Sequence, residues 1–96
     1  MADFSYAKAP GVRSRQVEGA AALMVFTEGE ERAYHLNLAC WYLFELSDGN
    51  PGERIAVAYA DTVAGNVPRE QALDYARTCL AELVKRGILL ACPMCD

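Results

Sequence analysis

The chain has 96 residues and a formal net charge of −4, from 13 acidic and 9 basic side chains, and we expect a single small domain. A protein that binds the DNA backbone usually gathers lysine and arginine on one face, so this acidic balance argues against nucleic acid as a partner. The longest apolar run, 20–26, is far shorter than the roughly 20 residues of a membrane helix. We therefore predict a cytoplasmic protein with no membrane span, whose 4 cysteines are reduced thiols rather than a disulfide framework.

The first part of the chain predicts an antiparallel meander. Residues 1–11 have no hydrophobic periodicity and are expected to be a flexible lead-in. Segments 12–17 and 20–26 have the character of short strands. Residues 32–36 alternate in side-chain character and predict a third strand, which follows an acidic hairpin loop.

The segment after the third strand predicts a helix that is covered on more than one side. Asn37 can cap its N-terminus, and between Leu38 and Leu46 only Glu45 is charged. A helix that is apolar on nearly every face has to be buried on several of them. Gly49 supplies the left-handed conformation at which such helices often end.

Two further helices are predicted after Gly49. The sequence from Asn50 to Glu53 resembles a capping box, with Pro51 at the first helical position. Apolar side chains at helical spacing then predict one helix over 55–63 and a longer one over 73–84.

The predicted fold class is α+β, with a three-stranded antiparallel sheet followed by three helices. We place the domain at residues 12–91, between the lead-in and a tail at 92–96. The helices would cover one face of the sheet, and its free edge must be protected or used.

Several short motifs follow one another in a fixed order over about residues 10–90. They are Tyr34-His35-Leu36-Asn37, Trp41, Leu46-Ser47-Asp48-Gly49, Glu53-Arg54-Ile55-Ala56 and the segment from Leu80 to Leu89. In this order and spacing the chain resembles the PqqD family of small peptide-binding domains, also called RiPP recognition elements.

The resemblance implies a winged helix-turn-helix-like domain that is not an enzyme and needs no cofactor. Such domains bind the leader segment of a ribosomally made precursor peptide and present the peptide to a modifying enzyme, of which radical-SAM proteins are one class. The leader joins the sheet as an extra strand beside the third strand and packs towards the third helix, a mode in which backbone hydrogen bonds give affinity and side-chain pockets give specificity.

The peptide-binding candidates lie on that strand and on one flank of the third helix. Ala72 and Ala76 are small and would leave room for an apolar guest side chain. The candidates are Arg32, Ala33, Tyr34, His35 and Leu36 on the strand, and Arg69, Ala72, Ala76, Cys79 and Leu80 on the helix.

Simpler interpretations stand beside these. Tyr34 is equally well explained as a core residue, and His35 as a solvated side chain. Arg32 suits an edge strand because a charge there discourages aggregation. Cys40 and Cys79 lie in apolar helical stretches and are expected to be small buried hydrophobic residues. The free strand edge also leaves open a monomer or an edge-paired homodimer.

Two other function classes remain open. A winged-helix DNA-binding regulator would fit the element order, but its recognition helix would offer only Arg77, Lys85 and Arg86 as cations. Cys92 and Cys95 have the CxxC spacing of a zinc half-site or a redox pair, or they belong to an incidental tail.

Overall fold

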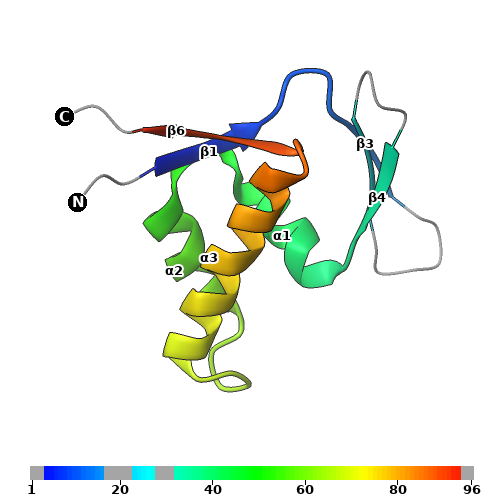
Figure 1. Cartoon of the computed structure of the whole chain (residues 1–96). Helices are drawn as coiled ribbons and strands as arrows, with labels where there is room; N and C mark the ends of the chain where they lie inside the picture. Colours follow the sequence, from blue (N-terminus) through cyan, green and yellow to red (C-terminus); the bar gives the residue numbers. More distant parts are fainter. Residues whose placement is uncertain (1–3, 17–22, 28–31, 94–96) are drawn as a thin grey trace.

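The computed structural model describes residues 4–16, 23–27 and 32–93, which form an α+β fold with three helices and two small antiparallel sheets (Figure 1). The elements in chain order are β1 (Phe4–Lys8), β2 (Arg13–Gln16), β3 (Leu23–Thr27), β4 (Arg32–Leu36), α1 (Leu38–Leu46), β5 (Asp48–Pro51), α2 (Gly52–Thr62), α3 (Arg69–Lys85) and β6 (Leu89–Pro93).

Strands β2, β3 and β4 form the predicted meander, in the order β2-β3-β4 with both pairings antiparallel. Leu23 lies opposite Leu36 and Val25 lies opposite Tyr34. Leu23, Val25 and Leu36 are buried, as expected for the inward face of a half-covered sheet, on which every second residue points the same way. The predicted fold class, a three-stranded antiparallel sheet with three helices, is confirmed.

A second sheet was not predicted. Strand β1 is its central strand and pairs antiparallel with β5 and β6, with Ser5 opposite both Pro51 and Cys92. The prediction of a flexible lead-in is therefore wrong for residues 4–8. The prediction failed because β1 pairs with strands that are far away in the sequence. A short strand of this kind is specified by its partners, and its own residues show no pattern that would identify it.

The start of α1 confirms one prediction. Asn37 is the N-cap, in extended backbone conformation, and its Oδ1 accepts a hydrogen bond of 2.8 Å from the backbone N–H of Cys40. This bond satisfies one of the N–H groups that have no partner inside the helix.

The segment between α1 and α2 differs from the expected stop and capping box. Gly49 has a φ of +85° but lies within β5, after the helix has already ended at Leu46. Asn50 donates from Nδ2 to the carbonyl of Leu46 at 2.8 Å, and Pro51 precedes α2 without a side-chain cap. The polar residues of this segment thus connect a helix to a strand rather than starting the next helix.

The core lies where α1 and α3 meet the inward faces of both sheets. Helix α1 lies between α3 and the β2-β3-β4 sheet, while β1 and β6 run side by side over the C-terminal end of α3 (Figure 1). Leu43 and Phe44 of α1 are 0% and 2% exposed. Trp41 and Tyr42 of the same helix are only partly buried and pack against this core.

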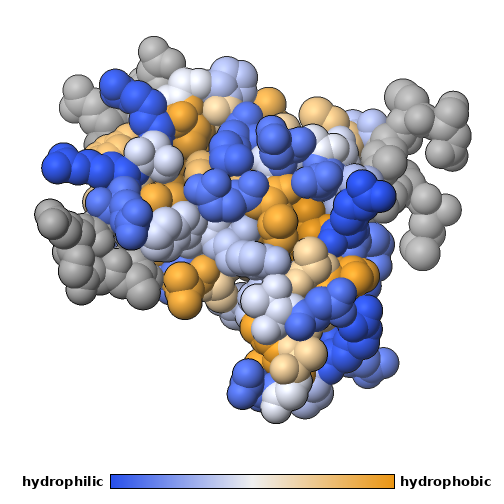
Figure 2. Space-filling view, turned by 180° about the vertical axis from the view of Figure 1, so that it is seen from behind, coloured by the Kyte–Doolittle hydropathy of each residue, from blue (hydrophilic) through white to orange (hydrophobic). Residues whose placement is uncertain are grey.

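The large apolar side chains that are exposed in the described part are Phe4, Phe26, Leu38, Tyr75 and Leu90. On the face opposite to that of Figure 1, hydrophobic and hydrophilic areas alternate, and no single apolar area dominates (Figure 2). None of the helices in residues 4–16, 23–27 and 32–93 combines the length and hydrophobicity needed to cross a membrane.

The place of β1 at the centre of a sheet predicts a cost for proline there. Ala7→Pro removes a backbone N–H from a strand with partners on both sides, and we expect about 1–3 kcal/mol of lost stability. Ala7→Ser keeps the N–H and should melt within a few degrees of the parent protein. Thermal unfolding followed by circular dichroism measures both. Equal melting temperatures for the proline variant and the parent would show that residues 4–8 contribute little to the fold.

Candidate functional site

Strand β4 forms one edge of the β2-β3-β4 sheet. It pairs with β3 on one side, and among the described residues no strand pairs with its other side. Its backbone therefore has N–H and C=O groups directed away from the sheet, which is the feature that a guest strand uses. Residue 32 is described here by its backbone only, opposite Thr27.

The side chains of β4 alternate between its two faces. Ala33 and His35 are exposed, and Leu36 is 2% exposed. Tyr34 is half-buried against the core, and the guanidinium carbon of Arg86 lies 5.5 Å from the centroid of its ring. Tyr34 thus joins the edge of the sheet to the C-terminal end of α3 through packing and a cation–π contact.

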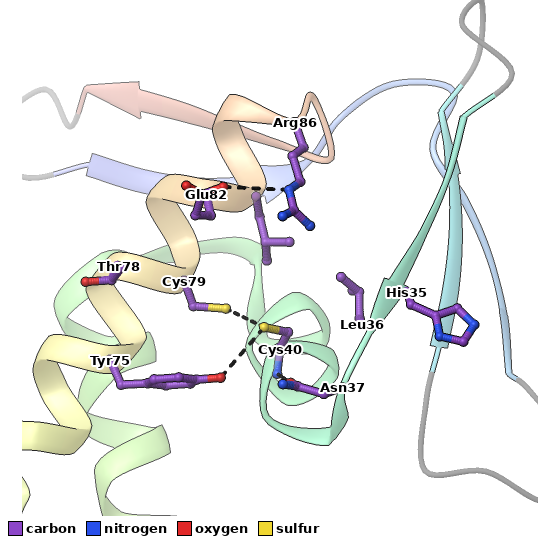
Figure 3. A pocket seen from close by; sticks show the side chains of 10 residues that line it. His35, Leu36, Asn37, Cys40, Tyr75, Thr78, Cys79, Glu82 and Arg86 are labelled. Atoms are coloured by element: carbon purple, nitrogen blue, oxygen red, sulfur yellow. Dashed lines mark hydrogen bonds and ion pairs between the residues drawn. The ribbon is translucent and has the colours of Figure 1, made fainter.

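A pocket of about 510 Å³, here called the β4–α3 pocket, lies beside this edge (Figure 3). The end of β4 and the first turn of α1 border it on one side, and α3 borders it on the other. Its lining residues are His35, Leu36, Asn37, Cys40, Tyr75, Thr78, Cys79, Glu82, Leu83 and Arg86.

Only part of the predicted binding set lies at this pocket. His35, Leu36 and Cys79 line it. Ala72, Ala76 and Leu80 do not, because they are 0%, 0% and 1% exposed in the core. The prediction that these three residues face a guest peptide is therefore contradicted by their burial.

Arg69 is also placed away from the pocket lining. It is the first residue of α3, and its Nη1 lies 3.0 Å from Oδ1 of Asp61 at the end of α2. Both side chains are more than half exposed, so this ion pair contributes little to stability. Arg69 links α2 to α3 at the opposite end of the helix from Arg86.

The rotation of α3 about its own axis determines which of its residues line the pocket and which enter the core. Its core residues Ala72, Ala76, Leu80 and Leu83 form one stripe at helical spacing. The pocket residues Tyr75, Thr78, Cys79, Glu82 and Arg86 form a neighbouring stripe, offset by about one residue. Sequence reasoning chose the more apolar stripe for the guest, although such a stripe is the one that usually faces the core. The neighbouring stripe of α3 mixes polar and apolar residues. This pattern could have identified Tyr75, Thr78, Glu82 and Arg86 as pocket residues from the sequence.

Two cysteines meet at the base of the pocket. Cys40 lies in the first turn of α1 and Cys79 in the middle of α3, and their sulfur atoms are 2.6 Å apart (Figure 3). Both are free thiols. The expectation that they are small buried hydrophobic residues holds in part, since Cys79 is buried, but Cys40 is only half-buried and both border a pocket.

Tyr75 lies next to this pair. Its hydroxyl is 4.0 Å from Sγ of Cys40, and its ring stacks on Tyr59 of α2 with centroids 5.7 Å apart. Burial is the main cause that raises the pKa of Tyr75 above its ordinary value of 10.0. The Tyr75 hydroxyl therefore keeps its proton at neutral pH and can donate a hydrogen bond to a sulfur anion.

These contacts make Cys40 the more acidic of the two thiols. The hydrogen bond from Cys79 is the main cause that lowers the pKa of Cys40 from 9.0 to about 6, helped by Tyr75 and the charge of Arg86 and opposed by burial. The same hydrogen bond, together with burial, raises the pKa of Cys79. Of the two thiols, Cys40 therefore loses its proton first, and its sulfur then accepts a hydrogen bond from the Cys79 thiol.

The CxxC cysteines of the tail were the other candidate site in the sequence. Cys92 is exposed near the end of β6, and Cys95 lies outside the described residues. Within the part of the chain that the structure describes, no three His, Cys, Asp or Glu side chains are grouped so that they could hold a metal ion.

The cations proposed for a DNA-recognition helix are largely paired with carboxylates. Arg77 Nη2 lies 2.8 Å from Oε1 of Glu53, and Arg86 Nε lies 3.6 Å from Oε2 of Glu82. Each of these two arginines thus has an acidic side chain beside it at the surface.

The comparisons with known proteins support the fold. No family model and no curated protein matches the chain, so membership of the PqqD family stays a prediction. A solved structure, TbiB1 in complex with the TbiA(beta) leader peptide, is similar with a TM-score of 0.70 and 17% sequence identity. The similarity covers 86% of this chain and 93% of that chain, and at this identity it shows a shared fold.

The hydrogen-bonded cysteine pair predicts an unusual pH dependence of alkylation. Iodoacetamide reacts with the thiolate, so the alkylation rate at Cys40 should rise with a midpoint at about pH 6. The midpoint for free cysteine is about 8.5. Quantitative mass spectrometry of the tryptic peptide 33–54 measures this rate. Tyr75→Phe removes one hydrogen-bond donor and should move the midpoint upwards. A midpoint close to that of free cysteine would contradict the proposed thiolate.

Proposed function

We propose that this protein is a non-catalytic adaptor that binds the leader segment of a ribosomally synthesised precursor peptide. The leader adds as an antiparallel or parallel strand to the free edge of β4, and its alternate side chains enter the β4–α3 pocket. The adaptor then presents the rest of the peptide to a modifying enzyme, and radical-SAM enzymes are one class that fits this role. The proposed place of action is the cytoplasm.

The observation that carries this proposal is the position of the β4 edge, with which no strand of the described residues pairs, directly beside a pocket. A guest strand on β4 would lie about 4.8 Å from it, and every second guest side chain would point towards the same side. The edge offers hydrogen bonds that do not depend on the guest sequence, whereas the pocket, lined by α3, can select particular side chains.

The chemistry of the pocket suits a peptide with both apolar and charged side chains. Leu36 and Leu83 supply apolar surface, and Arg86 and Glu82 form an exposed ion pair at 3.6 Å. Either charged side chain can exchange its partner for one from a guest, at a cost of about 0–1 kcal/mol for the exposed pair that is broken. The net charge of −4 and the paired arginines of α3 favour a peptide over nucleic acid.

The similar fold of TbiB1, whose structure contains a leader peptide, supports the same class of ligand. The geometry of the pocket motivates a revised set of guest contacts. This set comprises the backbone of residues 32–36, the side chains of Cys79 and Arg86, and the pocket residues Tyr75, Thr78 and Glu82.

A tryptophan in the pocket should block the guest. Thr78 lines the pocket and is exposed, so Thr78→Trp would fill the space without disturbing the core, and we expect on the order of ten-fold weaker peptide binding. Ala81→Trp is the matched control, because Ala81 is exposed on α3 but does not line the pocket. The probe is a peptide that is selected from a display library for binding to the full chain. Isothermal titration calorimetry with this peptide measures the affinities of both variants.

Amide NMR shifts recorded during the same titration locate the guest. We expect the largest shifts in residues 32–36 and along the pocket stripe of α3, with no saturable response to a short DNA duplex. Equal affinities of the two tryptophan variants, or shifts confined to the β5-β1-β6 sheet, would place the peptide elsewhere. Sedimentation of the free and bound protein distinguishes a monomer from an edge-paired dimer that the guest dissociates.

A further inference from the structure

The two sulfurs in the β4–α3 pocket belong to helices that are distant in sequence. Cys40 and Cys79 are brought to 2.6 Å by the packing of α1 on α3. A disulfide bond has a sulfur–sulfur distance of about 2.05 Å, so the two atoms are already close to bonding distance. The pocket gives a small reagent access to them, since both cysteines line it.

Titratable and charged groups surround this pair from every element that packs on it. From α3 come Tyr75, Glu82 and Arg86, and from α2 comes Tyr59, stacked on Tyr75. On β4 the ring of His35 is directed away from the two sulfurs (Figure 3). Arg86 favours a negative charge on the pair and Glu82 opposes one, while the Tyr75 hydroxyl lies 4.0 Å from Cys40.

We propose that Cys40 and Cys79 form a redox-active dithiol that hydrogen peroxide converts into an intramolecular disulfide between α1 and α3. The pocket is thus a site of reversible oxidation, in addition to any role in peptide binding. The reaction does not need the CxxC cysteines of the tail.

The reaction proceeds in two balanced steps. The Cys40 thiolate attacks one peroxide oxygen, the O–O bond breaks, and the departing hydroxide takes up a proton to become water. The Cys79 sulfur then attacks the sulfur of the Cys40 sulfenic acid. An S–S bond forms and the S–O bond breaks, and the second hydroxide leaves as water with the proton of the Cys79 thiol. Two thiols are oxidised by two electrons, and one peroxide is reduced to two waters.

The environment assigns a different role to each cysteine. Cys40 is the attacking residue because it is the less buried of the two and the more acidic member of the pair. Cys79 is the resolving residue, since its thiol keeps its proton until the second step. This order predicts that a variant without Cys79 stops at the sulfenic acid.

The disulfide should stabilise the fold. It would close a loop of about 40 residues, which restricts the unfolded chain, and little native movement is needed to form it. We expect the melting temperature of the oxidised protein to rise by about 10 °C. Joining α1 to α3 would also fix the distance between two walls of the pocket.

Peptide mapping of the full chain tests the proposal. The protein is treated with equimolar hydrogen peroxide, its remaining thiols are alkylated, and it is digested with trypsin without reduction. We expect peptides 33–54 and 78–85 to be joined, with a mass that is two hydrogen atoms below their sum. Reductant should release them and return the melting temperature to its original value.

Single variants separate this reaction from other oxidation. Cys79→Ser should leave Cys40 as a sulfenic acid that dimedone traps, and Cys40→Ser should prevent both products. Cys92→Ser should still form the joined peptides and show the rise in melting temperature. Separately alkylated peptides 33–54 and 78–85 after peroxide treatment, or a disulfide that joins Cys79 to another cysteine, would overturn the proposal. The measurements use no guest peptide, so their outcome is independent of the proposed adaptor function.

Discussion

Leu43 and Phe44 of helix α1 are almost entirely removed from solvent, although the helix is only nine residues long. Burying such side chains is worth about 1.5–3 kcal/mol each, so this helix has to be enclosed by other elements. Helices α2 and α3 and strand β4 all contact it, and Nζ of Lys8 on β1 lies 5.0 Å from the centroid of the Phe44 ring. The positions of both sheets therefore depend on α1. The β4–α3 pocket lies where this enclosure is incomplete.

The β5-β1-β6 sheet holds the two ends of the helical layer. Strand β1 joins β5, which leads into α2, to β6, which follows α3. The contact with α2 is close enough to require glycine. A Cβ on Gly52 would lie 2.7 Å from the Tyr6 ring and 3.4 Å from the carbonyl oxygen of Phe4. Because Gly52 has no side chain, the first residue of α2 can lie directly against β1, immediately after the end of β5.

The pocket combines two kinds of chemistry on one wall. The part near Arg86 and Glu82 is charged and solvated, whereas the part near Cys40 and Cys79 contains polarisable sulfur and the stacked ring of Tyr75. A guest side chain and an oxidant would meet the same surface. Peptide binding depends on the space beside Thr78 and on the edge of β4. Oxidation depends on the distance between the two sulfur atoms, on the acidity of Cys40 and on access of the oxidant through the pocket.

Local patterns in the sequence determined the meander of β2, β3 and β4, the apolar helix after it and the Asn37 cap. These features depend on period-2 and helical spacing and on a hydrogen bond between residues three apart, which neighbouring residues alone can specify. Three features were decided only by the tertiary structure. Residues 4–8 became a central strand because their partners are distant in the chain. The stripe of α3 that lines the pocket is offset by about one residue from the stripe chosen from the sequence, since each residue turns a helix by about 100° and only packing selects the rotation. Cys40 and Cys79 met because α1 packs on α3 at that rotation, and no spacing in the sequence relates residues on two different helices.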